Sequence, residues 1–426
     1  MQTRLADFIK NSPQGKDADA ILRSCVHCGF CLATCPTYQL LGDELDSPRG
    51  RIYLMKQMLE GQPVTQKTQL HLDRCLTCRA CETTCPSGVR YAELVDISRD
   101  LIEKQVDRPA GKKGLRYLLR KILPNPLLFK PLIKIGRLFR PFLPHSLKKS
   151  IPAKPNNAVR QWPAPRHKRK MMVLDGCVQP TLSPNINSAA ARVLDALDIS
   201  LIKSAQAGCC GAIAFHLNAQ EEGMEAMRKN IDAWWPFIER NEIEAIVMTA
   251  SGCGVTVKDY GHILRHDQAY AEKAERISAM TRDISEILVT EQEKLIQLLR
   301  KSRKDSTPSK FAFHSPCTLQ HGQQIKGLIE HILQTAGFEL ASVPDAHLCC
   351  GSAGTYSILQ PELSQQLLRN KVSALESGSP QQILTANIGC LMHIQSGTAL
   401  PVRHWIEVLE EHIHKDGIDT DPKLTR

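Results

Sequence analysis

A cysteine pattern that occurs twice between Cys25 and Pro86 constrains this chain more than any other feature of its sequence. Each copy reads Cys-x2-Cys-x2-Cys-x3-Cys-Pro. Three cysteines with two residues between them wrap a tight turn and point three sulfurs at one face of a metal centre. The fourth cysteine, followed by a proline, lies too far round the turn to close the same site comfortably. The copies consist of Cys25, Cys28, Cys31 and Cys35, and of Cys75, Cys78, Cys81 and Cys85.

This spacing is typical of bacterial ferredoxins with two clusters, in which the fourth cysteine of each run ligates the other cluster. We therefore predict two [4Fe–4S] clusters with crossed ligand sets. Zinc is the alternative, because paired Cys-x2-Cys elements also form zinc sites, although these seldom use three cysteines at this spacing. The first predicted set is Cys25, Cys28, Cys31 and Cys85, and the second is Cys75, Cys78, Cys81 and Cys35.

The segments around the cysteine runs predict helices. Ser47 and Pro48 form a helix start, with serine as the cap and proline at the first helical position. An apolar helical face follows between Ile52 and Leu59, and further helices are expected over 17–24 and 66–74. Helices between the runs, instead of short strands, predict an α-helical ferredoxin-type domain over residues 1–105.

The length and composition are those of an ordinary folded protein, and 426 residues predict about three domains. No apolar run reaches the ~18 residues that a membrane-spanning helix needs, and the N-terminal residues lack the apolar core of a signal peptide. Sixteen cysteines in such a chain favour metal or redox chemistry over disulfides. We expect a cytoplasmic location.

Residues 108–170 differ in charge from the rest of the chain. They contain 18 Lys or Arg, no Asp or Glu, and ten of the 25 prolines. The whole chain has a net charge of +10 and this segment has +18, so the other residues together have a net charge of −8. Apolar residues recur on one helical face between Leu115 and Leu123. Residues 106–170 are therefore predicted to be a basic, proline-rich linker or amphipathic segment.

Four interpretations of this basic segment are open. It is a solvated linker whose apolar residues cover the neighbouring domains, or it contacts a partner protein. It could also lie on an anionic membrane surface, at the inner face of the cytoplasmic membrane. Nucleic acid is the least favoured partner, because aromatic residues that stack on bases are sparse.

An internal repeat fills the remainder of the chain. Each copy opens with an apolar strand that ends at a cysteine, continues to a Cys-Cys-Gly 32 positions after that cysteine, and closes with a strand that ends in Gly-Cys. Helical patterns between the strands predict an α+β protein whose two related α/β half-domains, 171–305 and 306–426, have parallel sheets. Loops at the carboxyl ends of such strands bind ligands. The cysteines there are Cys177, Cys209, Cys210 and Cys253, and Cys317, Cys349, Cys350 and Cys390.

These eight cysteines have three interpretations. They are ligands of a further iron–sulfur cluster, redox thiols of low pKa, or buried apolar side chains, since free cysteine packs well. Adjacent cysteines followed by glycine at a strand–loop junction fill a core poorly, so the first two interpretations are favoured.

The tandem Cys-Cys-Gly region resembles the domains of heterodisulfide reductase subunits, of the iron–sulfur subunits of anaerobic glycerol-3-phosphate dehydrogenases, and of lactate-utilisation proteins. With the ferredoxin runs in front, the whole chain is similar to the iron–sulfur subunits of glycolate oxidase (glycolate dehydrogenase). The resemblance covers nearly all of the chain except the basic segment. Matching stretches include 25–31, 38–46, 48–53, 72–78, 179–184, 230–236 and 347–356.

The resemblance implies an electron-transfer subunit of an oxidoreductase complex. In that family, FAD-containing subunits oxidise glycolate to glyoxylate, and the iron–sulfur subunit passes the electrons onward, with a quinone as the expected acceptor. The sequence agrees, because it has no Gly-x-Gly-x-x-Gly for an FAD or NAD of its own. No catalytic residue is therefore assigned to this chain, and no nucleic-acid partner is expected. The alternatives are an iron–sulfur subunit of an anaerobic glycerol-3-phosphate dehydrogenase and a heterodisulfide-reductase-like catalytic subunit.

One departure from heterodisulfide reductases bears on the repeat. Their units end in Cys-x-x-Cys, whereas here Thr256 follows Cys253 and His393 follows Cys390 at the corresponding positions. Each half keeps four cysteines and lacks the fifth, which weakens the catalytic alternative. The histidine is either a replacement ligand, as in Rieske centres, or an ordinary hydrogen-bonded side chain.

Overall fold

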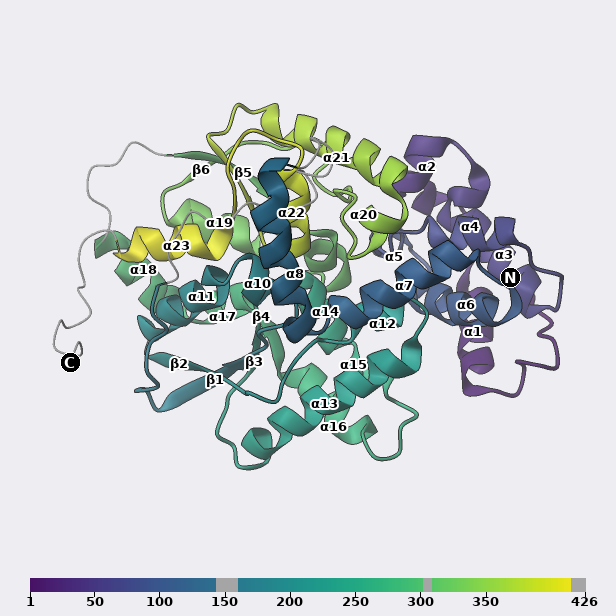
Figure 1. Cartoon of the computed structure of the whole chain (residues 1–426), viewed down its shortest axis with the longest axis horizontal. Coiled ribbons are helices and arrows are strands. Elements are labelled where there is room, and N and C mark those ends of the chain that lie inside the picture. The colour runs from purple at the N-terminus through teal and green to yellow at the C-terminus, as the bar shows by residue number, and fades with distance from the viewer. Residues whose placement is uncertain (143–159, 302–308, 415–426) are drawn as a thin grey trace.

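The computed structural model describes residues 1–142, 160–301 and 309–414 of the 426-residue chain. The N-terminal helices lie together at one end of the molecule, and two sheet-containing halves fill the rest (Figure 1). In this view the teal first half lies below the green and yellow second half. The protein is therefore α+β, as the sequence predicted.

The N-terminal part is helical, and no strand occurs in residues 1–142. The Ser47 side chain accepts a hydrogen bond of 3.0 Å from the Gly50 amide and caps α3, the helix start that the sequence predicted. Met55, Leu72 and Leu94 from three different helices are buried in one core. The elements are α1 (Pro13–Ser24), η1 (Phe30–Leu32), α2 (Pro36–Leu41), η2 (Glu44–Asp46), α3 (Pro48–Leu59), α4 (Gln66–Asp73), α5 (Ala80–Thr84) and α6 (Tyr91–Gln105).

The basic segment forms two more helices, α7 (Ala110–Ile122) and α8 (Pro126–Phe139), and the turn η3 (Arg140–Phe142). Its continuation, 143–159, lies outside the described residues. Helix α7 contacts α12 (Ala212–His216) and α8 contacts α10 (Gln179–Leu182), so both helices lie over the first half. None of the described helices, α8 included, has the length and apolarity that crossing a membrane requires.

Each half contains a four-stranded parallel sheet, and the strand order is the same in both. The first sheet has the order β2-β1-β3-β4 and the second β6-β5-β7-β8. The two matching parallel sheets confirm the prediction from the sequence that each half of the repeat has a parallel sheet. The strands are β1 (Arg169–Val173), β2 (Ile199–Lys203), β3 (Ile246–Met248), β4 (Thr281–Asp283), β5 (Lys310–His314), β6 (Glu339–Leu340), β7 (Gln382–Thr385) and β8 (Val402–His404).

Helices cover the sheets, so the strands are apolar on both sides. Met171 and Val173 of β1 pack into one core and Met172 into another, because successive side chains of a strand point to opposite faces. The first half adds α11 (Asn185–Asp195), α13 (Gln220–Glu239), α14 (Ser251–Lys258), α15 (Tyr260–Ile263), α16 (Ala271–Met280), α17 (Ile284–Thr290) and α18 (Gln292–Lys301). The second has η4 (Thr318–Gly322), α19 (Leu328–Thr335), α20 (Tyr356–Leu359), α21 (Pro361–Glu376), α22 (Ile388–Gln395) and α23 (Trp405–His414).

The two halves share one hydrophobic core. Helix α11 of the first half packs against α23 of the second, and the Asn185 amide donates to the Glu407 carboxylate at 3.2 Å. The loops after β3 and β7 also meet, since the Ser251 amide donates to the Ala386 carbonyl at 3.2 Å. The halves therefore form one packed unit in which the cysteine-bearing strand ends lie close together.

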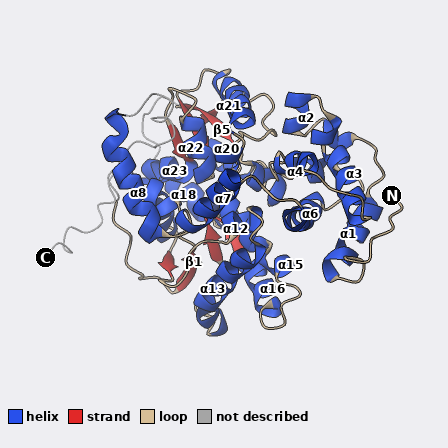
Figure 2. Cartoon of the chain, turned by 45° about the vertical axis from the view of Figure 1, so that its right-hand side comes forward, coloured by secondary structure: helices blue, strands red, loops and turns tan. Residues whose placement is uncertain are grey.

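The N-terminal helices lie beside this unit, as Figure 2 shows in a view turned by 45° from that of Figure 1. Arg79 forms an ion pair with Asp259 of the first half. The Tyr356 hydroxyl of the second half donates to the Arg74 carbonyl at 3.1 Å. The second cysteine run thus faces both halves of the repeat.

Candidate metal centres

The two ferredoxin-type runs fold into loops of the same shape. In each copy, the residues two and four positions after the first cysteine have a positive φ: His27 (57°) and Gly29 (86°), then Thr77 (52°) and Arg79 (60°). Residues other than glycine adopt this conformation at a cost and are therefore seldom found in it. The repeated conformation indicates that both loops are shaped to bring their cysteines together.

Two small cavities lie within these loops, and cysteines from both runs line each of them. Cys81 borders both cavities, Cys85 joins the first run and Cys35 joins the second. This grouping supports the crossed ligand sets, which stay a prediction. The cysteines of one cavity are Cys25, Cys28, Cys31, Cys81 and Cys85, and those of the other are Cys35, Cys75, Cys78 and Cys81.

The donor set suits a positively charged metal centre. Burial and the neighbouring Cys25 raise the pKa of Cys31 to about 11, and burial raises the pKa of Cys78 and Cys81 well above that of a free thiol. Buried thiolates side by side are unfavourable unless a cation lies among them. Iron supplies that charge, so these residues fit the iron–sulfur clusters that the spacing predicts.

A buried arginine lies beside the second set. Arg51 is 1% exposed, and its Nη1 lies 4.0 Å from Cys35 Sγ while its Nη2 donates to Asp46 at 3.1 Å. Burial alone would lower the pKa of Arg51, but Tyr91, Cys75, Cys35 and Asp46 raise it on balance. A permanent positive charge therefore faces these cysteines and favours the negative charge that electron uptake adds.

Four cysteines of the first half come together at the carboxyl end of its sheet. Cys177 follows β1, Cys209 and Cys210 follow β2, and Cys253 lies in α14. Hydrogen bonds from Cys177 and Cys210 lower the pKa of Cys209 well below that of a free thiol. The Asn230 amide holds the loop by donating to the Cys209 carbonyl at 2.8 Å. The first half therefore presents a thiol cluster with one member ready to bind metal as thiolate.

The glycine of each Cys-Cys-Gly is required by the backbone. Gly211 and Gly351 have φ values of +90° and +89°. A Cβ on Gly211 would lie 2.5 Å from the Gly223 carbonyl oxygen of α13, and one on Gly351 would lie 2.7 Å from the Ser364 carbonyl oxygen of α21. Only glycine therefore allows these loops to press against their helices.

The four cysteines of the second half lie together and join two hydrophobic clusters, because the thiols of Cys349 and Cys350 are hydrogen-bonded to each other. Cys317 and Cys349, with their sulfurs 3.8 Å apart, belong to an apolar cluster against which Cys78 of the N-terminal part packs. Cys350 and Cys390 belong instead to the core that the two halves share. The structure thus brings one predicted ferredoxin-type ligand against two cysteines of the repeat.

A cavity of about 540 Å³ lies where the N-terminal loops meet both halves. Its lining includes cysteines of all three parts together with charged side chains such as Arg79 and Asp259. Cys209 and Cys350 lie outside this lining. The cysteines around the cavity are Cys75, Cys78, Cys177, Cys210, Cys253, Cys317, Cys349 and Cys390.

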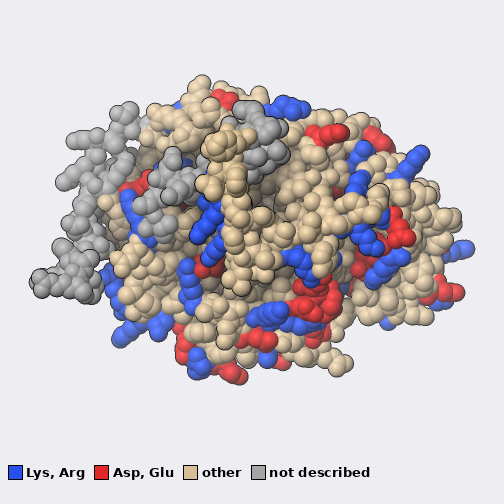
Figure 3. All heavy atoms as spheres, viewed as in Figure 1, with Lys and Arg blue, Asp and Glu red and all other residues tan. Residues whose placement is uncertain are grey.

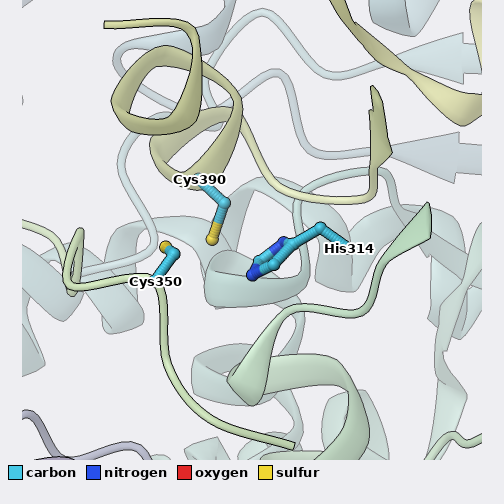
Figure 4. A group of neighbouring side chains, drawn as sticks. All are labelled: His314, Cys350 and Cys390. Carbon is cyan, nitrogen blue, oxygen red and sulfur yellow. The ribbon is translucent and has the colours of Figure 1, made fainter. Parts of the chain in front are cut away.

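The two residues in place of the missing fifth cysteines make hydrogen bonds. Thr256 Oγ1 donates to the Gly252 carbonyl at 3.0 Å, and His393 Nε2 lies 3.2 Å from Ser364 Oγ. The hydrogen-bonded interpretation therefore describes His393. A different histidine, His314 at the end of β5, lies with Cys350 and Cys390 (Figure 4). The sequence analysis missed it, although it stands three residues before Cys317.

Two protein-family models match separate parts of the chain. A family model described as "4Fe-4S dicluster domain" matches residues 21–89, and one described as "Cysteine-rich domain" matches 171–258 and 311–395. These ranges contain all sixteen cysteines.

Curated relatives match nearly all of the chain or about half of it. The glycolate oxidase iron-sulfur subunit of Escherichia coli (strain K12) is 55% identical over 98% of this chain and 100% of that protein. The probable glycolate oxidase iron-sulfur subunit of Bacillus subtilis (strain 168) is 28% identical over 91% of this chain and 92% of that protein. Lactate utilization protein A of Geobacillus thermodenitrificans (strain NG80-2) is 27% identical over 56% of this chain and 98% of that protein. The chain therefore belongs to the family of glycolate oxidase iron–sulfur subunits.

Proposed function

We propose that this chain carries electrons within a glycolate-oxidising complex. FAD-containing partner subunits oxidise glycolate to glyoxylate, and the electrons pass through this chain to an acceptor. When bound, iron–sulfur clusters take up and release single electrons. The observation that carries the proposal is the packing of Cys78 against Cys317 and Cys349, because it joins the ferredoxin-type loops directly to the repeat.

The regions then have separate roles. Residues 1–105 hold two clusters, and the halves 171–305 and 306–426 continue the path at their Cys-Cys-Gly loops. Helices α7 and α8 of the basic segment cover the first half and offer a contact surface. Arg51 supplies positive charge at the second cysteine set, and the shared core fixes the distance between the halves.

Anaerobic purification of this chain with its flavoprotein partners tests the proposal. Added glycolate should produce the EPR signals of reduced clusters, and a quinone analogue should abolish them. The chain purified alone should not oxidise glycolate. A complex that turns over glycolate while its cluster signals stay constant would contradict the proposal.

Paired substitutions test the crossed ligand sets. If Cys35 and Cys75 share a cluster, Cys35→Ser with Cys75→Ser should cost about four irons per chain, whereas Cys35→Ser with Cys25→Ser should cost about eight. Uncrossed sets predict the reverse. Cys390→Ser, in the second half, is the control that leaves both N-terminal clusters in place.

We extend the proposal to one further iron–sulfur cluster at the thiol cluster of the first half. The two N-terminal clusters account for about eight irons per chain. A clear excess that disappears in Cys209→Ser would support the further cluster. Iron that stays near eight in both proteins would exclude it.

We also propose that the basic segment contacts an anionic membrane surface, where a quinone acceptor is found. Leu127, Leu138 and Phe142 are 83%, 71% and 85% exposed, and Figure 3 shows uncharged atoms along α8 with Lys and Arg beside them. Basic, apolar helices bind such surfaces. The full chain should sediment with vesicles that contain anionic lipid. Leu138→Glu should reduce the sedimented fraction more than the control Ile358→Glu, which alters an exposed residue outside the basic segment. Equal sedimentation of both variants would count against the assignment.

The heterodisulfide-reductase-like alternative has less support. Thr256 and His393, at the positions of the fifth cysteines, make hydrogen bonds to Gly252 and Ser364. A glycerol-3-phosphate dehydrogenase subunit is the other alternative, and co-purification with a glycerophosphate-oxidising flavoprotein would favour it.

A further inference from the structure

We infer that the surface around the first cysteine run is where an FAD-containing partner subunit docks and transfers its electrons to this chain. Of the sixteen cysteines, all of which lie within the described residues, Cys28 alone is exposed. Val26 and Phe30, the apolar residues on either side of it in the loop, are 67% and 61% exposed. The inference rests on the proposed electron transfer and adds the face at which the electrons enter.

The exposed side chains of this surface come from elements that pack together. Helix α3 contacts both η1, which begins at Phe30, and η2, which contains Leu45. Arg49 of α3 lies against the cysteine loop, because a Cβ on Gly29 would be 2.9 Å from its Nη1 atom. Tyr53 is 49% exposed and follows Arg49 by one helical turn, so both lie on the same face of α3. Contiguous exposed apolar patches mark sites of protein contact. We call the following residues the entry face: Val26, Cys28, Phe30, Leu45 and Tyr53.

The loop that carries Cys28 is fixed before any partner binds. The Cys25 amide donates to the Leu22 carbonyl at 3.2 Å, and the Leu32 amide donates to the Gly29 carbonyl at 3.0 Å. Cys25 also belongs to the hydrophobic core of the N-terminal helices. A surface that is already ordered loses little conformational entropy on association, which favours binding. The entry face is therefore prepared for a partner.

The position of the entry face selects an electron donor as its occupant. Cys28 belongs to the first predicted cluster set, so a protein that covers it comes close to an electron carrier. The second set faces the repeat instead, because Cys78 packs against Cys317 and Cys349 of this same chain. Figure 1 shows α3 at the end of the molecule that points away from the repeat, and α5 on the side toward it. The first set is thus open to an outside donor, and the second set leads into the repeat.

The make-up of the entry face suits a protein surface better than a lipid surface. Arg49 and Glu44 form an ion pair of 2.7 Å beside the apolar side chains, and an apolar centre with a polar rim is typical of protein–protein interfaces. Helix α8, which we assign to the membrane surface, lies well apart from α3 in both Figure 1 and Figure 2. Contact of α8 with a membrane would therefore leave the entry face free for the flavoprotein.

Binding and reduction experiments with the full chain and its FAD-containing partners test the entry face. Partner binding should slow amide hydrogen exchange in residues 26–31 and 44–54, but not in α8 or α23. Phe30→Glu and Tyr53→Glu should each weaken partner binding ~10-fold or more, and should slow cluster reduction by glycolate at partner concentrations below saturation. Ile358→Glu, which changes an exposed residue of the second half, is the control and should leave both measurements unchanged.

Iron content and reduction of the clusters by dithionite show whether the variants keep their clusters. Phe30 adjoins Cys31, so if Phe30→Glu loses iron, Tyr53→Glu on α3 decides alone. Wild-type clusters that glycolate does not reduce would contradict the proposed function, while hydrogen exchange would still locate the bound partner. Protection confined to the repeat or to the basic segment, or unchanged partner binding in Tyr53→Glu, would overturn the inference. A Tyr53→Glu variant that loses self-association or vesicle binding instead of partner binding would overturn it as well.

Discussion

Replacing Arg51 by Gln should lower the reduction potential of the cluster assigned to Cys35, Cys75, Cys78 and Cys81. The Arg51 Nη1 atom lies 4.0 Å from Cys35 Sγ. Two unit charges at that distance interact by about 4 kcal/mol at an effective dielectric constant of ~20. Because the added electron is spread over the whole cluster, we expect about half of this, ~2 kcal/mol. For a one-electron couple this is roughly 80 mV, since 59 mV corresponds to a tenfold change.

An EPR-monitored redox titration of the anaerobic protein measures this shift. Arg51→Lys is the control, because it keeps the charge and loses the same planar fork, so its potential should stay within roughly 30 mV of the wild type. Both variants should be less stable than the wild type, because each disturbs the buried ion pair between Arg51 and Asp46. Asp46 still has its second ion-pair partner, Arg74, at 2.7 Å. A Gln variant whose potential rises, or falls no further than that of the Lys variant, would refute the electrostatic argument.

Three further changes have expected outcomes. Gly351→Ala should destabilise the second half by at least ~1–3 kcal/mol, because φ of +89° and the Ser364 carbonyl both oppose a Cβ. Gly327→Ala is the control in thermal unfolding, since Gly327 also has a positive φ but open space around it. Equal losses of stability in the two variants would contradict a steric effect of the Ser364 carbonyl. Burial raises the pKa of Asp283 to about 6, above ~3.9 in the unfolded chain. Ionisation of Asp283 therefore opposes folding, and the free energy of unfolding should fall by about 3 kcal/mol as the pH rises from ~4 to ~6. Unfolding scans of Asp283→Asn should show a weaker dependence of stability on pH in this range. An unchanged pH dependence would show that another group causes it. Asp259→Asn leaves Arg79 without its ion-pair partner and should speed amide exchange in the 75–85 loop, while Asp232→Asn, on an exposed part of α13, should not.

The sequence predicted the local features of this protein well. The two cysteine runs, the Ser47 cap and the paired strands of the repeat depend on residues close together in the chain, so spacing alone indicates them. The fold class followed from the order of strands and helices, and the comparisons confirm the family. These features were accessible because each has a local physical cause.

The relations between distant segments could not be predicted in this way. Nothing near Cys78 indicates that it packs against Cys317 and Cys349, because that contact depends on how the N-terminal helices dock. His314 was overlooked for a related reason. Its closeness to Cys390 arises from the pairing of β5 with β7, and only an alignment of the two repeats, with Leu174 opposite it, would have drawn attention to it.

The common core of the two halves has an evolutionary consequence. Two identical subunits that met through α11 and α23 would carry the same residue at every equivalent position, so any substitution would appear on both sides at once. Joining the halves in a single polypeptide removes that restriction while the α11–α23 contact keeps their geometry. One half can then carry histidine (His314) and threonine (Thr385) where the other carries leucine (Leu174) and methionine (Met248). Tandem fusion thus permits a symmetric scaffold to carry unlike side chains at equivalent positions of its two halves.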